Sequence, residues 1–184
     1  MNPFPRPPPE HPADEVLARG RFVRLLRRDG WEFIDQPGLR GLVVMVAVTP
    51  DRKLLLVEQH RTPLNGATLE LPAGMVGDKG EDEPFEVGAT RELEEETGWR
   101  AGHMDFLTCG PASPGRTRYY YHFYRARDLV RTGSGGGDEF EAITVHEAPL
   151  DDIDRWLAAR AADGLHVDPK IYVGLYFLQR EARG

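Results

Sequence analysis

The chain has 184 residues, of which 40% are apolar and 29% are charged. This length and composition fit one globular domain with its own hydrophobic core. The net charge of -7, without a long lysine or arginine run, argues against a protein whose main affinity is for nucleic acid or for an anionic membrane surface. Cys109 is the only cysteine, which excludes an intrachain disulfide and suits a reducing compartment.

The first residues, MNPFPRPPPEHP, are rich in proline and lack the apolar core of a secretory signal. The longest apolar run, residues 42–48, is far shorter than the roughly 20 residues that cross a bilayer. We therefore expect a cytoplasmic protein without a membrane or nucleic-acid partner. Residues 1–18 are expected to form a flexible arm, and residues 19–184 a single domain.

Runs of β-forming residues between turn signals predict several strands in the first half of the domain. These strands are expected over residues 21–28, 31–34, 42–49, 53–59 and 68–71. Asp29-Gly30 is a strong hairpin signal between the first two runs. The apolar third and fourth runs flank Pro50-Asp51 and predict a central hairpin that is buried on both faces.

The second half of the chain mixes helices with strands. We expect helices over residues 84–97, 151–162 and 168–182, and strands over residues 100–109, 118–125 and 143–147. Gly98 ends the first helix at a position where glycine is favoured, and Asp168-Pro169 predicts the start of the last one. Residues 132–137, TGSGGG, are expected to form a flexible loop. The order of elements indicates an α+β layout rather than a regular βαβ series.

Glu92, Glu95 and Glu96 occupy positions i, i+3 and i+4 of the first helix, so their carboxylates are expected to converge. An adjacent apolar stripe consists of Phe85, Ala89 and Leu93. Several carboxylates on one rigid face, near the loop of residues 72–74, match the preference of Mg²⁺ or Mn²⁺ for hard oxygen ligands. The alternative is a solvated acidic face, because each like-charged pair costs a helix only about 0.2–0.5 kcal/mol.

Residues 77–99, GDKGEDEPFEVGATRELEEETGW, resemble the Nudix box, the signature of the Nudix hydrolase family. The fixed residues of the match are Gly77, Glu83, Arg91, Glu92, Glu95, Glu96 and Gly98. A chance match of seven such positions is expected on the order of 10⁻⁷ to 10⁻⁸ per starting position. Trp99 stands where the box usually has an aliphatic residue. The box can also be aligned in a second register. In that register Gly74 is its first glycine, and Gly80-Glu81 is its later glycine-glutamate pair.

This resemblance implies an α/β/α sandwich with a mixed sheet and an N-terminal β-hairpin extension. The family cleaves nucleoside diphosphates that are linked to another moiety. Glu92, Glu95 and Glu96 would hold Mg²⁺ or Mn²⁺ together with the Ala73 carbonyl, and Arg91 would orient a box carboxylate through a salt bridge.

Flanking motifs resemble one branch of the family, the ADP-ribose pyrophosphatases and nucleoside diphosphate sugar hydrolases. These motifs are ELPAG within residues 69–74, Gln59-His60-Arg61, and Pro114 within Ser113-Pro114-Gly115. The resemblance covers about residues 20–179 and implies substrate contacts by Arg61, Glu70, Met75 and Pro114, with Trp31 or Phe33 stacking on a base. It also implies a homodimer in which residues 19–40 lie at the interface. Core packing for the aromatics, and a surface position for Arg61, remain alternatives.

Arg116 and Arg118 stand where the branch often has an acidic residue, which favours another sugar or an extra phosphate contact. Relatives place a glutamate that activates water in the stretch occupied here by Glu139 and Glu141, so either of these, or a box glutamate such as Glu95, is the expected base. A polar turn is the alternative for that stretch. Alternative functions are a nucleoside triphosphate or coenzyme A pyrophosphatase, and a sensor that binds nucleotide sugars without hydrolysing them.

Overall fold

The structure is a computed structural model that describes residues 11–77, 83–137 and 142–183. Its strands are β1 (Glu15–Arg19), β2 (Arg24–Arg28), β3 (Trp31–Asp35), β4 (Gly41–Ala47), β5 (Lys53–Arg61), β6 (Gly66–Glu70), β7 (Ala73–Val76), β8 (Trp99–Arg100), β9 (His103–Pro111), β10 (Tyr120–Arg127), β11 (Val130–Arg131), β12 (Ile143–Pro149) and β13 (His166–Val167). Its α-helices are α1 (Phe85–Thr97), α2 (Ile153–Ala162) and α3 (Lys170–Glu181). None of the described helices is both long enough and apolar enough to cross a membrane.

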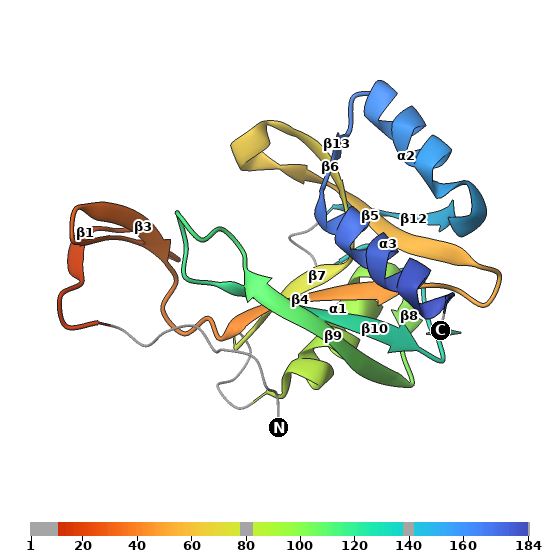
Figure 1. The fold of residues 1–184 in the computed structure, drawn as a ribbon, viewed down its shortest axis with the longest axis horizontal. Coiled ribbons are helices and arrows are strands. Elements are labelled where there is room, and N and C mark those ends of the chain that lie inside the picture. Colours follow the sequence, from red (N-terminus) through yellow and green to blue (C-terminus); the bar gives the residue numbers. More distant parts are fainter. Residues whose placement is uncertain (1–10, 78–82, 138–141, 184) are drawn as a thin grey trace.

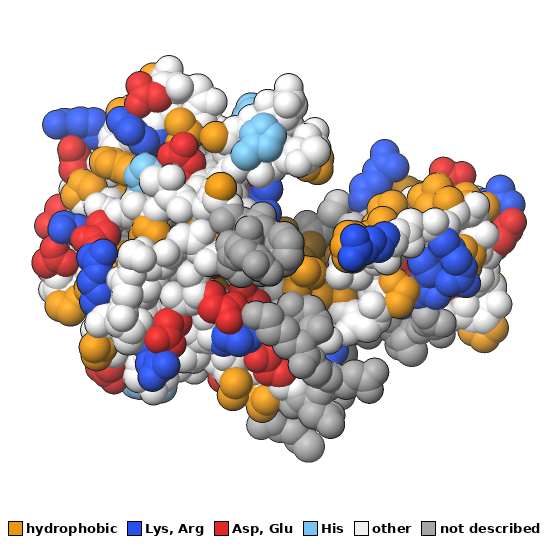
Figure 2. All heavy atoms as spheres, turned by 180° about the vertical axis from the view of Figure 1, so that it is seen from behind, with side chains coloured by type: hydrophobic (Ala, Val, Ile, Leu, Met, Phe, Trp, Pro, Cys, Tyr) orange, Lys and Arg blue, Asp and Glu red, His pale blue; other side chains and the backbone are white. Residues whose placement is uncertain are grey.

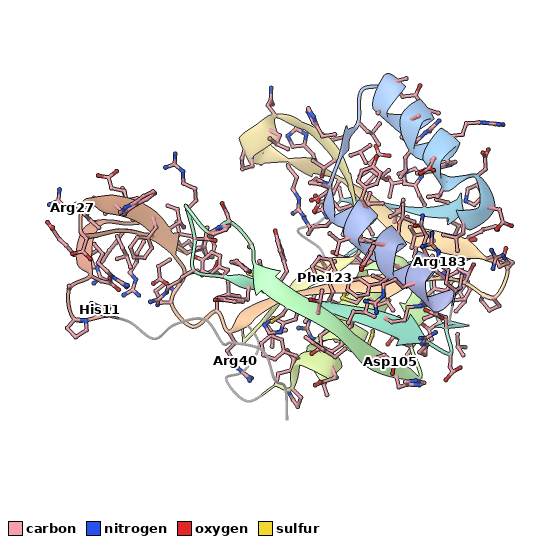
Figure 3. All side chains as sticks on the ribbon, viewed as in Figure 1. His11, Arg27, Arg40, Asp105, Phe123 and Arg183 are labelled. Atoms are coloured by element: carbon pink, nitrogen blue, oxygen red, sulfur yellow. The ribbon has the colours of Figure 1, made fainter. Side chains whose placement is uncertain are left out.

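A four-stranded mixed sheet of order β7-β4-β10-β9 lies between α1 and α3 (Figure 1). Successive residues of β4 point to opposite faces of this sheet. Val43 and Met45 pack with Ala89 and Leu93 of α1. Val44 and Val46 pack on the other face with α3, together with Phe123 of β10, which is labelled in Figure 3. The expected α/β/α sandwich with a mixed sheet is confirmed.

A second sheet of order β12-β5-β6-β13 carries the continuation of the chain, with α2 packed near β12 and β13. The prediction of a β4–β5 hairpin is wrong, although both strands are buried. They share one bridge, between Val48 and Leu54, and then enter different sheets. The reason is that β4 is hydrogen-bonded on both edges, by β7 and β10, and β5 likewise by β12 and β6.

The N-terminal extension is a three-stranded antiparallel sheet of order β1-β2-β3, which projects to the left of the main body in Figure 1. Arg27, labelled in Figure 3, lies on this projection. The expected hairpin turn is present, because Asp29 and Gly30 both have positive φ, at 51° and 82°. The expected arm is wrong at residues 15–18, which form most of β1, and residues 1–10 lie outside the described residues.

Helix α1 follows the sequence pattern closely. Pro84 precedes its first residue in an extended conformation, and Gly98 ends it in the left-handed region with φ 71° and ψ 17°. Helix α3 begins after Asp168-Pro169, where the Lys170 amide donates to the Asp168 carboxylate at 2.7 Å. The short strands β7, β8, β11 and β13 were not expected, because two to four residues carry too little pattern to reveal a strand.

Candidate functional site

Helix α1 carries the candidate metal ligands, and Arg91 holds two of them together. Its Nη1 atom donates to Glu92 Oε1 at 2.8 Å and to Glu95 Oε2 at 3.0 Å. Its Nε and Nη2 atoms donate to Glu83 Oε1 and Oε2 at 3.1 and 3.3 Å. These bonds, led by those to Glu83, raise the pKa of Arg91, so its charge is secure. The expected salt bridge between Arg91 and a box carboxylate is therefore present.

Glu96 takes a different partner, at the start of β7. Its side chain is almost completely buried, and its Oε2 atom accepts a hydrogen bond from the Ala73 amide at 3.0 Å. Gly74 lies against Glu92, because a β-carbon at position 74 would overlap the Glu92 carboxylate. The box helix and residues 73–74 are thus packed together, as expected, but these two residues belong to β7 and not to the expected loop.

The three helix carboxylates do not form one cluster. Within the described ranges, no three His, Cys, Asp or Glu side chains stand close enough together in this conformation to coordinate one metal ion. The expected convergence is met by Glu92 and Glu95, which share Arg91, whereas Glu96 turns to the Ala73 amide. Arg91 and Glu95 also line a surface groove of about 740 Å³ along α1. Viewed from behind, on the α1 side, acidic side chains gather in the middle of the molecule next to basic ones (Figure 2).

Arg61 and Glu70 form a second charged group, between β5 and β6. Arg61 donates from Nε and Nη2 to the two Glu70 carboxylate oxygens at 2.7 and 3.0 Å, and the Thr68 hydroxyl also donates to Glu70. Burial opposes the ionisation of Glu70, but the hydrogen bonds from Arg61 and Thr68 outweigh it, so the pKa of Glu70 is lowered. Glu70 is therefore a carboxylate that orients Arg61, whose side chain is 41% exposed.

A third group lies where the N-terminal sheet meets the loop before β10. A pocket of about 210 Å³ is lined by Arg28, Trp31, Phe33, Pro114, Arg116 and Arg118. Trp31 is 69% exposed, so its ring faces solvent rather than the core. Three residues expected to bind substrate, Trp31, Pro114 and Arg118, thus border one pocket that combines aromatic rings with cationic side chains.

Comparison with known proteins shows the family to which this chain belongs. A family model described as the NUDIX domain matches residues 39–166. The chain belongs to the Nudix family. Relatives of this Nudix protein include the methanol dehydrogenase activator of Bacillus methanolicus, 35% identical over 140 residues, which are 76% of this chain and 72% of the relative. The ADP-ribose pyrophosphatase of Bacillus subtilis is 36% identical over 149 residues, 80% of this chain and 75% of the relative.

A solved structure has the same fold as this Nudix protein. The crystal structure of ADP compounds hydrolase superposes with a TM-score of 0.64 at 24% identity, over 91% of this chain and 90% of the other. At this identity the likeness concerns the fold alone.

Two predicted parts of the Nudix site lie outside the described residues. These are the candidate bases Glu139 and Glu141, and Glu81 of the second box register. Glu83, the alternative to Glu81, pairs with Arg91 as described above. Met75 is 39% exposed on β7, and its sulfur lies 3.4 Å from the Gln36 side-chain nitrogen.

Two residues that organise these groups, Thr68 and Asp35, were not predicted from the sequence. Thr68 could have been found, because it lies two residues before Glu70 and hence on the same face of a strand. Asp35 could not. It is 1% exposed, and it accepts a hydrogen bond from Arg118 at 2.6 Å and another from Arg24. Arg118 and Asp35 are 83 residues apart, so no local pattern joins them.

Proposed function

We propose that this Nudix protein is a metal-dependent pyrophosphatase that hydrolyses the diphosphate linkage of ADP-ribose or a related nucleoside diphosphate sugar. The observation that carries the proposal is the box helix, on which one guanidinium nitrogen of Arg91 holds Glu92 and Glu95 within 3.0 Å. The substrate class is supported by the Bacillus subtilis relative, whose name is ADP-ribose pyrophosphatase. The products would be a nucleoside monophosphate and a sugar phosphate.

We infer Mg²⁺ or Mn²⁺ as the cofactor because carboxylate oxygens, the ligands that such an ion prefers, lie on α1 beside the backbone of residues 73–74. Arg91 Nη1 occupies the place between Glu92 and Glu95 where a cation is electrostatically favoured, and Gly74 leaves the room that the Glu92 carboxylate uses. The ion would be held by Glu92, Glu95, Glu96 and the Ala73 carbonyl. A divalent cation held there would neutralise negative charge on the diphosphate and lower the pKa of an attacking water.

The chain's own residues supply binding and proton transfer. Arg61, whose Nε and Nη2 atoms donate to Glu70, would bring its positive charge to the diphosphate. Trp31 or Phe33 would stack on the base, with Pro114 and Arg118 at the border of the same pocket and Met75 beside the substrate. Glu139 or Glu141, or alternatively Glu95, would accept the proton of the water whose oxygen attacks phosphorus as the bridging P–O bond breaks.

A substrate panel tests this function. The purified protein is incubated with ADP-ribose, GDP-mannose, a nucleoside triphosphate and coenzyme A, each with Mg²⁺ or with Mn²⁺, and products are separated by ion-exchange chromatography. We expect AMP from ADP-ribose, or the corresponding monophosphate from another sugar nucleotide, and no product when EDTA replaces the metal. Preferred cleavage of the triphosphate or of coenzyme A would refute the substrate class. Tight binding of sugar nucleotides without turnover would favour the sensor.

We further propose that the protein is a homodimer joined through the N-terminal sheet. This sheet projects from the main body (Figure 1) and exposes Val16, Phe22, Val23 and Trp31. Exposed apolar groups in a contiguous element favour association. Light scattering after size exclusion is expected to give twice the chain mass, and Phe22→Ser to shift it toward the monomer. Tyr172→Ser, at an exposed position of α3, is the matched control and should leave the dimer intact.

A further inference from the structure

The glycine-rich stretch of residues 132–137 is packed onto the end of the box helix, contrary to the expectation of a flexible loop. The Gly137 amide donates to the Glu95 carbonyl at 3.1 Å and the Gly136 amide to the Glu96 carbonyl at 2.8 Å. The Thr132 and Gly133 amides donate to the Gly98 carbonyl at 2.8 and 3.1 Å. Two of the carbonyls that receive these bonds belong to Glu95 and Glu96, the residues whose side chains are candidate metal ligands.

Only glycine allows this contact. A β-carbon on Gly135 would overlap the Glu96 carbonyl oxygen and the Thr97 backbone, and a β-carbon on Gly98 would overlap Gly133. Gly135, Gly136 and Gly137 also have φ values of 68°, 117° and 79°, which disfavour any residue with a side chain. We call Gly135, Gly136 and Gly137 the glycine clamp.

The end of α1 needs such support. The last carbonyls of a helix lack partners within the helix, and the last turn frays readily. Negative side chains near a helix C-terminus are unfavourable, because that end carries partial negative charge. Here the last turn contains Glu94, Glu95 and Glu96 and no basic residue. The clamp's amides supply positive partial charge at this end, where both the backbone and the side chains are negative.

We propose that the glycine clamp is a positioning element of the active site, which holds the last turn of α1 so that the Glu95 and Glu96 carboxylates stay in place for the metal. This rests on the proposed metal function of those residues. Clamp and metal are then coupled: a formed clamp strengthens metal binding, and by reciprocity bound metal stabilises the clamp by the same factor.

The first test measures Mn²⁺ affinity by electron paramagnetic resonance or calorimetry, with Glu96→Gln identifying the signal of this site. Gly135→Ala is expected to weaken binding about 10-fold or more, the size of effect seen when residues supporting metal ligands are changed. Gly133→Ala is the matched control, because its β-carbon would meet no atom within 4 Å and its φ is not positive. The control should stay within about 2-fold of wild type. Equal affinities for Gly135→Ala and wild type would overturn the proposal.

The second test needs no substitution and decides the question even if Gly135→Ala does not fold. Amide hydrogen exchange of Gly136 and Gly137 is followed by NMR with and without saturating Mg²⁺. We expect slowing of about 10-fold or more by Mg²⁺, while Gly102, whose amide donates to the Arg127 carbonyl, serves as the internal reference. No Mn²⁺ binding by wild type would refute the metal function itself. Normal metal binding with exchange unaffected by Mg²⁺ would refute the clamp alone.

Discussion

Replacing Glu96 by glutamine separates the fold from the chemistry of the site. Glu96 is 3% exposed and accepts the Ala73 amide at 3.0 Å. Glutamine has nearly the same volume and keeps a carbonyl oxygen that can accept this bond. A hydrogen bond to a charged acceptor is stronger than one to a neutral acceptor by about 1 kcal/mol, and burying a neutral group costs less than burying a charge. The free energy of unfolding is therefore expected to change by at most about 1 kcal/mol.

The effect of Glu96→Gln on hydrolysis is expected to be much larger. Removing a group that merely supports a metal ligand costs about 10–100-fold, so loss of a ligand's charge should lower kcat/KM by at least about 100-fold, or about 2.7 kcal/mol. Glu94→Gln is the matched control on the same helix. Glu94 pairs with Arg100, whose side chain is 62% exposed, and such surface pairs contribute about 0–1 kcal/mol. Its kcat/KM should stay within about 2-fold of wild type.

The assay measures AMP release from ADP-ribose at several Mg²⁺ concentrations, with urea unfolding of each variant in parallel. A folded Glu96→Gln protein with wild-type kcat/KM would refute the assignment of Glu96 to the metal. An equal loss in Glu94→Gln would show that negative charge on the helix, rather than one ligand, is what matters.

Three further predictions follow from buried and exposed contacts. Burial lowers the pKa of His122 in the folded chain. As pH falls, the unfolded chain therefore takes up the proton first, and the stability present above about pH 6.5 is lost below it. Urea unfolding at neutral and mildly acidic pH should show a smaller loss in His122→Phe than in wild type, and an equal loss in the two proteins would contradict this prediction. Trp31→Ala should raise KM for ADP-ribose about 10-fold through lost base stacking, with kcat unchanged, and an unaltered KM would place the base elsewhere. Gly74→Ala forces a β-carbon into the Glu92 carboxylate. Urea unfolding should therefore show a free energy of unfolding lower by about 1–3 kcal/mol, and kinetics should show a lower kcat. A stable variant with wild-type kcat would contradict this packing.

Local pattern was sufficient for the elements that depend on near neighbours. The spacing of Phe85, Ala89 and Leu93, together with Gly98, predicted α1 almost to the residue, because helix ends and faces are set by residues within one or two turns. The same holds for the Asp29-Gly30 turn. The candidate metal ligands were also available from spacing, since i, i+3 and i+4 on a helix share a face.

Pairing between distant segments was decided by the tertiary structure. The sequence could not show that β4 and β5 separate into two sheets, because an apolar strand has two equivalent edges and carries no mark of its partner. Nor could it show that Arg118 binds Asp35, or that Glu96 accepts a hydrogen bond from the Ala73 amide.

The run TGSGGG, residues 132–137, shows most clearly which properties follow from the sequence and which follow from the tertiary structure. Because these residues are glycines, the backbone can adopt positive φ at Gly135, Gly136 and Gly137. From composition alone, this freedom predicts a flexible loop. Whether the run moves or packs closely depends on which part of the folded chain lies against it. In the folded chain the carbonyls at the end of α1 lie opposite, and the absence of side chains lets the two backbones meet.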